Sequence, residues 1–195
     1  AEAAKGSFSG YMAAQKSSSE RMTIRAARTV GKDRRSVQIN GGRKVTRREA
    51  REHCFKMLFC QDFYPAEEKE EQLERYFEAP KEDVTGEDGI DEILHDPFEK
   101  EEDRAYLEKR VEKIMELIPE IDEKINEIAE GWRTRRMGKV ELTILRLAVF
   151  EMKYDEEIPE KVAINEAVEL AKKFGGDEAP AFVNGILAKL IQKGN

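Results

Sequence analysis

The chain has 195 residues, of which 38% are charged and 39% are hydrophobic, and its formal net charge is −7. This composition, with 13 Gly and 6 Pro, favours helices and excludes a collagen-like chain. No apolar run approaches the ~20 residues that a membrane-spanning helix needs. The charge is uneven, because residues 1–45 hold ten Lys/Arg and three Asp/Glu, whereas the remaining 150 residues hold 24 and 38. The acidic excess of the longer part argues against bulk affinity for nucleic acid, so any such binding needs a local basic patch.

Residues 1–45 are rich in Ser, Gly and Arg and nearly lack periodic apolar residues. Three interpretations remain open for this head: a disordered basic arm, an extension that is not native to the domain, or an organelle transit segment. The ordered domain is therefore expected over residues 46–195. The two cysteines, Cys54 and Cys60, are too few for a disulfide framework. In a reducing cytoplasm we expect them to behave as small apolar residues.

The first half of the domain shows helical periodicity. Thr46 to Glu49 fit a capping box, which predicts a helix that starts there and ends before Pro65. A second helix is predicted over 67–79, and it is followed by an acidic loop over 80–89 and one helical turn over 90–94. A long amphipathic helix is predicted over 101–118. Pro119 is predicted to open the next helix, because proline suits the first helical position.

The second half is more apolar. The segment 138–154 is hydrophobic nearly all round, which is typical of a central helix covered on most sides. A further helix is predicted from Pro159 to the glycine pair at 175–176, and a last one through Ile191. No strand signal competes. We therefore predict an all-α domain of about seven helices in two packed bundles, the N-terminal one over about 46–118 and the C-terminal one over about 119–195.

Patterns that indicate catalysis are missing from the sequence. The two histidines are His53 and His95, and His53 does not form a nucleophile–base pair with Cys54, because adjacent helical residues point about 100° apart. The chain has no CxxC or HExxH metal motif and no GxxxxGK[ST] or GxGxxG phosphate loop. We predict a protein that is not an enzyme and that has no metal or cofactor.

The basic start of the first helix is one candidate binding site. It carries Arg47, Arg48 and Arg51 within a ~100° arc, where the helix macrodipole already disfavours cations. Either these arginines form ordinary surface pairs with Glu49 and Glu52, or they gather around a phosphate, with Phe59 offering a ring to a base. In the second case, replacing all three by Ala is expected to leave the melting temperature nearly unchanged.

The end of the 159–174 helix is a second candidate. Lys172, Lys173 and Phe174 precede a tight turn, and Glu178 and Phe182 follow it. Cations and rings close together suit single-stranded nucleic acid, where bases stack and phosphates meet positive charge. The alternative is that both phenylalanines belong to the core and that the lysines complement the helix dipole.

Four segments together resemble one family. They are residues 161–174, residues 182–187, residues 132–148 with Glu141 and Leu145 among them, and the arginine-rich opening 47–52. In their order along the chain they resemble the NusB transcription antitermination factors, and the resemblance covers about residues 46–193. Residues 1–45 have no counterpart in it.

The resemblance implies a seven-helix fold and a non-enzymatic role in the cytoplasm. It implies pairing with a small-subunit ribosomal protein, NusE, and binding of the single-stranded boxA element of nascent RNA, so that RNA polymerase reads through terminators in ribosomal RNA operons. The RNA face that it implies on this chain consists of Arg47, Arg48, Arg51, Phe59, Phe174, Glu178 and Phe182, to which Lys172 and Lys173 are added. Glu141 falls in the helix expected to meet NusE. Glu49, Phe59 and residues 179–181 depart from the pattern of some relatives. Each departure is expected either to weaken RNA affinity or to shift RNA binding toward the state bound to the partner.

Two other functions remain open. Domains that resemble NusB also precede the catalytic domain of some ribosomal-RNA methyltransferases, in which case this chain would be an RNA-binding domain whose catalytic part is absent. The length of the natural open reading frame distinguishes this case. A purely structural helical protein is the third possibility, and specific RNA binding would exclude it.

Overall fold

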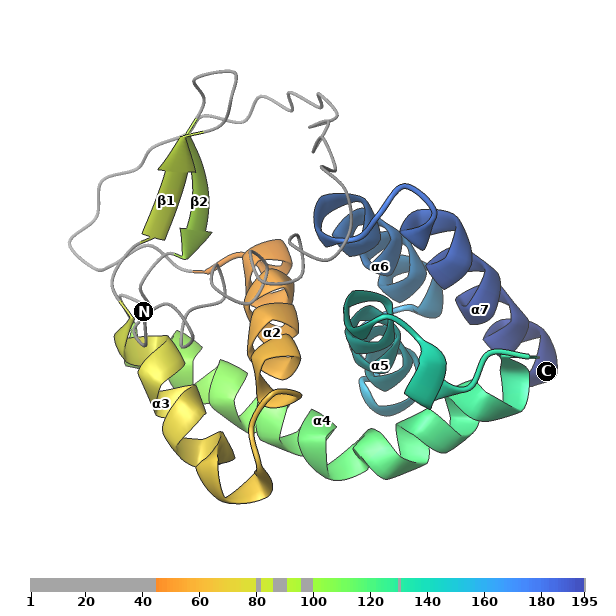
Figure 1. Ribbon diagram of the computed structural model, residues 1–195, viewed down its shortest axis with the longest axis horizontal. Helices are drawn as coiled ribbons and strands as arrows, with labels where there is room; N and C mark the ends of the chain where they lie inside the picture. The colour runs from red at the N-terminus through yellow and green to blue at the C-terminus, as the bar shows by residue number, and fades with distance from the viewer. Residues whose placement is uncertain (1–44, 80–81, 86–90, 96–99, 130, 195) are drawn as a thin grey trace.

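The computed structural model describes residues 45–79, 82–85, 91–95, 100–129 and 131–194. Within these ranges the fold is carried by six α-helices (Figure 1). They are α2 (Arg47–Gln61), α3 (Lys69–Glu78), α4 (Glu101–Ile128), α5 (Lys139–Tyr154), α6 (Glu160–Phe174) and α7 (Ala179–Gly194). The predicted all-α class is confirmed. The predicted basic head lies outside the described residues, apart from Val45.

The N-terminus of α2 is closed by the predicted capping box. The Glu49 N–H donates to Thr46 Oγ1 at 3.2 Å, and the Thr46 N–H donates to Glu49 Oε2 at 2.9 Å. These two bonds satisfy amides that the first helical turn leaves without partners. The preceding residue is also held, because the Val45 N–H donates to Asp103 Oδ2 at 3.1 Å in the first turn of α4. The start of α2 is thus fixed in place.

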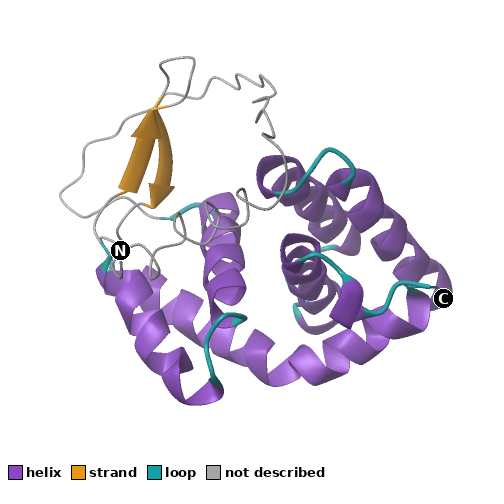
Figure 2. Ribbon diagram, in the orientation of Figure 1, coloured by secondary structure: helices purple, strands orange, loops and turns teal. Residues whose placement is uncertain are grey.

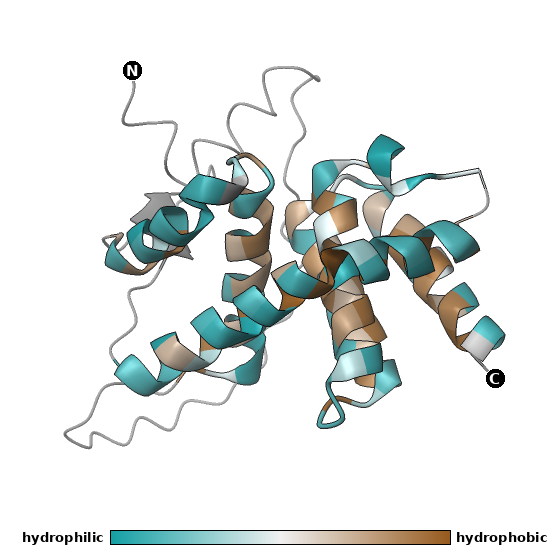
Figure 3. Cartoon of the chain, turned by 90° about the horizontal axis from the view of Figure 1, so that it is seen from below, coloured by the Kyte–Doolittle hydropathy of each residue, from teal (hydrophilic) through white to brown (hydrophobic). Residues whose placement is uncertain are grey.

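The central helix is α5, as its composition predicted. It packs against α2, α4, α6 and α7, and its side chains Ile144, Leu145 and Leu147 are almost completely buried. The brown, hydrophobic stretch of ribbon in the middle of Figure 3 shows how apolar this helix is among its more polar neighbours. Burial of such side chains contributes about 1.5–3 kcal/mol each, so α5 anchors the elements that carry the candidate site.

The helix α4 corrects one prediction. It is continuous from Glu101 to Ile128 with Pro119 inside it, so the predicted start of a new helix at Pro119 is wrong. A mid-helix proline removes one backbone hydrogen bond. Ile114, Ile121 and Ile125 nevertheless form one fully buried stripe that crosses Pro119 and keeps both parts of α4 against the core. The merger of two predicted helices explains why six are found among the described residues instead of about seven.

A small hairpin corrects a second prediction. The strands β1 (Glu82–Thr85) and β2 (Asp91–His95) pair antiparallel, whereas a loop and a helical turn were expected there (Figure 2). Residues 80–81 and 86–90 lie outside the described residues. Segments of four and five residues are too short for helical and strand periodicity to be told apart, and their pairing depends on backbone hydrogen bonds that any sequence can make.

Candidate functional site

The arginines at the start of α2 have unequal environments. Arg51 is only 8% exposed and lies between α5 and α6. Its Nε is 2.9 Å from both carboxylate oxygens of Glu151, and its Nη1 donates to Glu166 Oε2 at 3.2 Å. This arginine therefore holds α2 against two other helices, and the expected presentation of its guanidinium to phosphate is not what the structure shows.

Glu151 joins Arg51 to a second arginine. It is 2% exposed and also accepts from Arg110 Nη2 of α4 at 3.0 Å, while Arg110 Nη1 lies 2.5 Å from Asp155 Oδ2. Burial raises the pKa of the Glu151 carboxyl, and Arg51 and Arg110 act against that rise. Because each buried charge depends on the other, the network of Arg51, Arg110, Glu151, Asp155 and Glu166 locks α2, α4, α5 and α6 together.

This network changes one expectation and was missed by sequence reasoning. Removal of Arg51 leaves part of a buried carboxylate unpaired, so replacing Arg47, Arg48 and Arg51 together is not expected to be neutral for stability. A signal was present in the sequence. Glu151 lies on a helix that is apolar nearly all round, and a carboxylate there requires a cationic partner.

Arg47 and Arg48 remain at the surface. Both are exposed, and Arg48, whose side chain is 64% exposed, lies 3.9 Å from Glu169 Oε2 on α6. A pair at this distance and exposure is worth about 0–1 kcal/mol and yields readily to a competing anion. These two arginines therefore retain the geometry expected for phosphate binding at the start of α2.

Phe59 does not present a ring to solvent. Its side chain has no exposed surface, and its ring centroid lies 6.0 Å from that of Phe55 and 5.2 Å from that of Phe63. Stacking of a base on Phe59 would require this cluster to open. In the observed conformation Phe59 contributes to the core of α2 and not to a binding surface.

The end of α6 meets α2. Lys173 Nζ lies 2.9 Å from Glu52 Oε2, and the ring of Phe174 stacks on Phe55 with centroids 4.7 Å apart. Lys172 is exposed and pairs with Glu169 at 2.7 Å. Phe174 is half-buried, so it serves the core on one side and leaves an edge on the other. Two candidate sites that are more than 120 residues apart in sequence thus share one surface.

A close helix–helix corner places Glu178 and Phe182 next to this surface. A Cβ on Gly175 would lie 2.5 Å from the Ala179 Cβ and 2.8 Å from the Ala171 carbonyl oxygen, so only glycine permits the approach of α7 to the end of α6. Glu178 is exposed. Phe182 is half-buried and makes an edge contact with Trp132, with ring centroids 5.6 Å apart.

Glu141 lies in the first turn of α5 and is half-buried. Its carboxylate is folded back over Gly138, where a Cβ would collide with it. An acidic residue at this position complements the helix macrodipole. The structure therefore gives Glu141 a local role, and its predicted contact with a partner stays a prediction.

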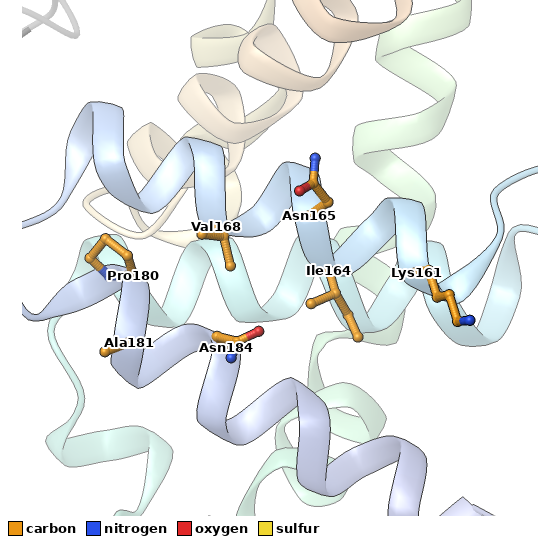
Figure 4. A pocket seen from close by; sticks show the side chains of 7 residues that line it. All are labelled: Lys161, Ile164, Asn165, Val168, Pro180, Ala181 and Asn184. Atoms are coloured by element: carbon orange, nitrogen blue, oxygen red, sulfur yellow. The ribbon is translucent and has the colours of Figure 1, made fainter. Parts of the chain in front are cut away.

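An open hollow of about 430 Å³ lies between α6 and α7. Figure 4 shows the side chains around it, which come from both helices and mix apolar and amide groups. They are Lys161, Ile164, Asn165, Val168, Pro180, Ala181 and Asn184. Over the described residues, no group of three or more His, Cys, Asp or Glu side chains is placed to hold a metal ion. Nor is any helix in these ranges long and apolar enough to cross a membrane.

Comparison with family models gives a match to the NusB family over residues 48–192. Among curated proteins, the chain is 48% identical over 147 residues to the transcription antitermination protein NusB of Lachnoclostridium phytofermentans, which covers 75% of this chain and 99% of the relative. It is 45% identical over 145 residues to the protein of the same name from Agathobacter rectalis, covering 74% and 98%.

Solved structures agree with the sequence relatives. A structure of NusB from T. maritima is 30% identical, with a TM-score of 0.60, and covers 77% of this chain and 94% of that one. A crystal structure of the antitermination factors NusB and NusE in complex with dsRNA contains a chain that is 26% identical, with a TM-score of 0.54 and coverage of 75% and 96%.

Proposed function

The chain belongs to the NusB family of transcription antitermination factors, which are not enzymes, and on this premise we propose which RNA and which partner it binds. It binds single-stranded boxA-type RNA together with the ribosomal protein NusE. The complex joins RNA polymerase in the cytoplasm and promotes read-through in ribosomal RNA operons. This assignment takes precedence over a methyltransferase-linked domain, because the relatives matched over 98–99% of their length are named as antitermination proteins.

One observation carries the RNA assignment. The basic start of α2 and the corner between α6 and α7 meet on one surface, as the Lys173–Glu52 and Arg48–Glu169 contacts show. The surface combines cations with the half-buried ring of Phe174. Such a combination suits a single strand, in which phosphates meet cations and unstacked bases meet rings. A relative of similar fold has been crystallised with NusE and RNA, which supports the same class of ligand here.

The cations of this surface are held only by weak ion pairs, so they can exchange their glutamate partners for phosphate. The lysine and arginine pairs with Glu52 and Glu169 are surface or half-exposed pairs, each worth about 0–1 kcal/mol. Phosphate competes with these carboxylates for the same donors, because arginine forks bind it through two hydrogen bonds and lysines bind it as point charges. We therefore assign direct RNA contacts to Arg47, Arg48, Lys172, Lys173, Phe174, Glu178 and Phe182. Arg51 acts by positioning α2, and Phe59 acts through the core beneath it.

The partner assignment rests on Glu141. It is an acidic residue in the first turn of a largely apolar helix, and it keeps part of its surface accessible. A basic residue of NusE is the complementary group. Pairing at this place would position NusE beside the start of α5.

A titration of RNA with and without NusE tests the proposal. We expect the chain with NusE to bind a boxA-type strand at least tenfold more tightly than a scrambled strand of equal length, and to bind it more tightly than the chain alone. Residues 1–45 carry a net charge of +7, so the titration is repeated with residues 45–195 alone to remove non-specific attraction. Equal affinity for both strands in both forms of the protein would exclude boxA recognition.

A further inference from the structure

The connection between α4 and α5 exposes an unusual set of side chains. Trp132, Arg133, Arg135 and Arg136, here called the basic loop, are all exposed, and Trp132 is 55% exposed. Three arginines within four positions form the densest group of arginines in the described part of the domain. A large ring left in water next to them is costly unless something else covers it.

The backbone of the basic loop is held firmly. The Thr134 N–H donates to Asn126 Oδ1 at 2.8 Å, and Asn126 Nδ2 donates to Thr134 Oγ1 at 3.1 Å. Thr134 and Met137 are buried and point inward. Gly131 adopts a φ of +80°, which lets the chain turn out of α4. The exposed residues are therefore presented on a fixed support, and a ligand would not have to order the loop.

The arginines of the basic loop have no carboxylate partners among the described residues, where no salt bridge involves any of the three. The surface formed by α2 and α6 is different, since Arg48, Lys172 and Lys173 each pair with a glutamate there. The donors of the basic loop are available to an anion without first breaking an ion pair.

The basic loop is continuous with the RNA surface. The Trp132 ring meets the Phe182 ring at an interplanar angle of 73° with centroids 5.6 Å apart. Phe182 lies in the first turn of α7 and Glu178 directly precedes that helix, next to the end of α6. A strand that reaches Phe182 therefore finds a second ring and three cations beyond it.

We propose that the basic loop extends the RNA site, with Trp132 stacking on a base and Arg133, Arg135 and Arg136 binding the phosphates of nucleotides that flank the boxA-type segment. This proposal rests on the proposed function and adds the residues that read the flank. RNA is favoured over a protein partner because the loop joins three arginines, carried on a backbone that is held in place, to a pair of rings. Phosphates alternate with bases along a single strand, so neighbouring cations and rings suit such a strand.

The test compares two RNAs on the full chain in complex with NusE. One RNA is limited to the boxA-type segment, and the other carries single-stranded flanks at both ends. The variant Arg133→Gln/Arg135→Gln/Arg136→Gln keeps the side-chain length but removes the charges. The control variant Arg75→Gln/Lys109→Gln/Lys113→Gln removes three exposed charges from α3 and α4 and has the same net charge.

We expect the flanked RNA to bind the loop variant at least tenfold more weakly than the wild type, while the short RNA changes less than threefold. The slope of log affinity against log salt for the flanked RNA becomes shallower by about 0.7 for each lost phosphate contact. The control variant matches the wild type on both RNAs. Trp132 is the single tryptophan of the chain, so flanked RNA added to the chain alone quenches its fluorescence and short RNA quenches it less.

Three results would overturn the proposal. The first is that the loop variant binds the flanked RNA as tightly as the wild type does. The second is that the control variant loses as much affinity as the loop variant, and the third is that the loop variant loses affinity for NusE and not for RNA. The last result makes the basic loop a protein interface. Failure of the proposed function gives a separate signature, in which the wild type binds scrambled and boxA-type segments equally.

Discussion

Arginines gather at two places in the part of the protein that the structure describes, the start of α2 and the loop before α5, and they behave in opposite ways. At α2, Arg51 is buried against Glu151 and Glu166 from two other helices. In the basic loop, Arg133 and its two neighbours are exposed and lack carboxylate partners among the described residues. The comparison shows that an arginine cluster in a sequence is not by itself a binding site. Neighbouring carboxylates and burial decide whether such a cluster holds helices together or is available to bind a ligand.

The energetic difference follows from desolvation. Removal of one partner from a buried pair leaves an uncompensated charge and costs about 3–5 kcal/mol, whereas removal of an exposed charge changes stability by about 0.5 kcal/mol or less. The α2 region should therefore be sensitive in folding experiments, and the loop region in binding experiments.

The largest expected effect is on stability. Glu151→Gln leaves Arg51 and Arg110 buried without their shared counter-charge, so we expect the free energy of unfolding to fall by about 3–5 kcal/mol. For the loop variant Arg133→Gln/Arg135→Gln/Arg136→Gln, the free energy of unfolding is expected to fall by about 0.5 kcal/mol or less. Urea denaturation of both variants measures the difference. Equal midpoints would show that the two arginine clusters are energetically alike.

The next effect concerns the partner. Glu141→Lys reverses the charge at the first turn of α5, a few residues after the basic loop, and should weaken NusE binding by about 2 kcal/mol or more. Calorimetric titration with NusE measures this. Glu116→Lys on the exposed face of α4 is the matched control and should bind NusE as the wild type does. Unchanged affinity of the Glu141 variant would remove this residue from the interface.

A tenfold effect is expected for the exposed arginines of α2. Arg47→Ala/Arg48→Ala should lower the affinity of the NusE complex for boxA-type RNA by about tenfold and make the salt slope shallower by about 0.7 per lost contact. The melting temperature should hold or rise slightly, because two cations leave the positive end of the helix dipole. Arg75→Ala/Lys109→Ala is the control. A loss of stability instead of RNA affinity would mean that these arginines resemble Arg51.

The smallest effect is on the pH dependence of stability. Burial raises the pKa of the Cys54 thiol from its usual 9.0 to about 12. Above pH 9 the unfolded chain loses this proton first, so stability falls as pH rises, by about 1 kcal/mol or less up to pH 9.5. Cys54→Ala should show a shallower decline in urea midpoints between pH 8 and 9.5. Identical slopes for the variant and the wild type would indicate that the Cys54 thiol is accessible to solvent and that the α2 region is more open than the structure shows.

Local patterns predicted much of the fold. The capping box at Thr46, the central position of α5 and the all-helical class each follow from interactions within a few residues or from helical periodicity. The continuity of α4 across Pro119 did not follow, because the buried isoleucine stripe that stabilises it depends on helices far away in the sequence. The hairpin was missed because its strands are stabilised by each other.

The sequence by itself determined which residue types are present, where the helices start and which segments resemble NusB, because these depend on neighbours along the chain. Only the tertiary structure decided which arginines are available. Arg51 and Arg48 are three positions apart on one helix, yet Arg51 meets carboxylates from α5 and α6 while Arg48 faces solvent. The electrostatic environment of a side chain is set by groups that folding brings within a few ångströms, and sequence spacing does not encode those distances.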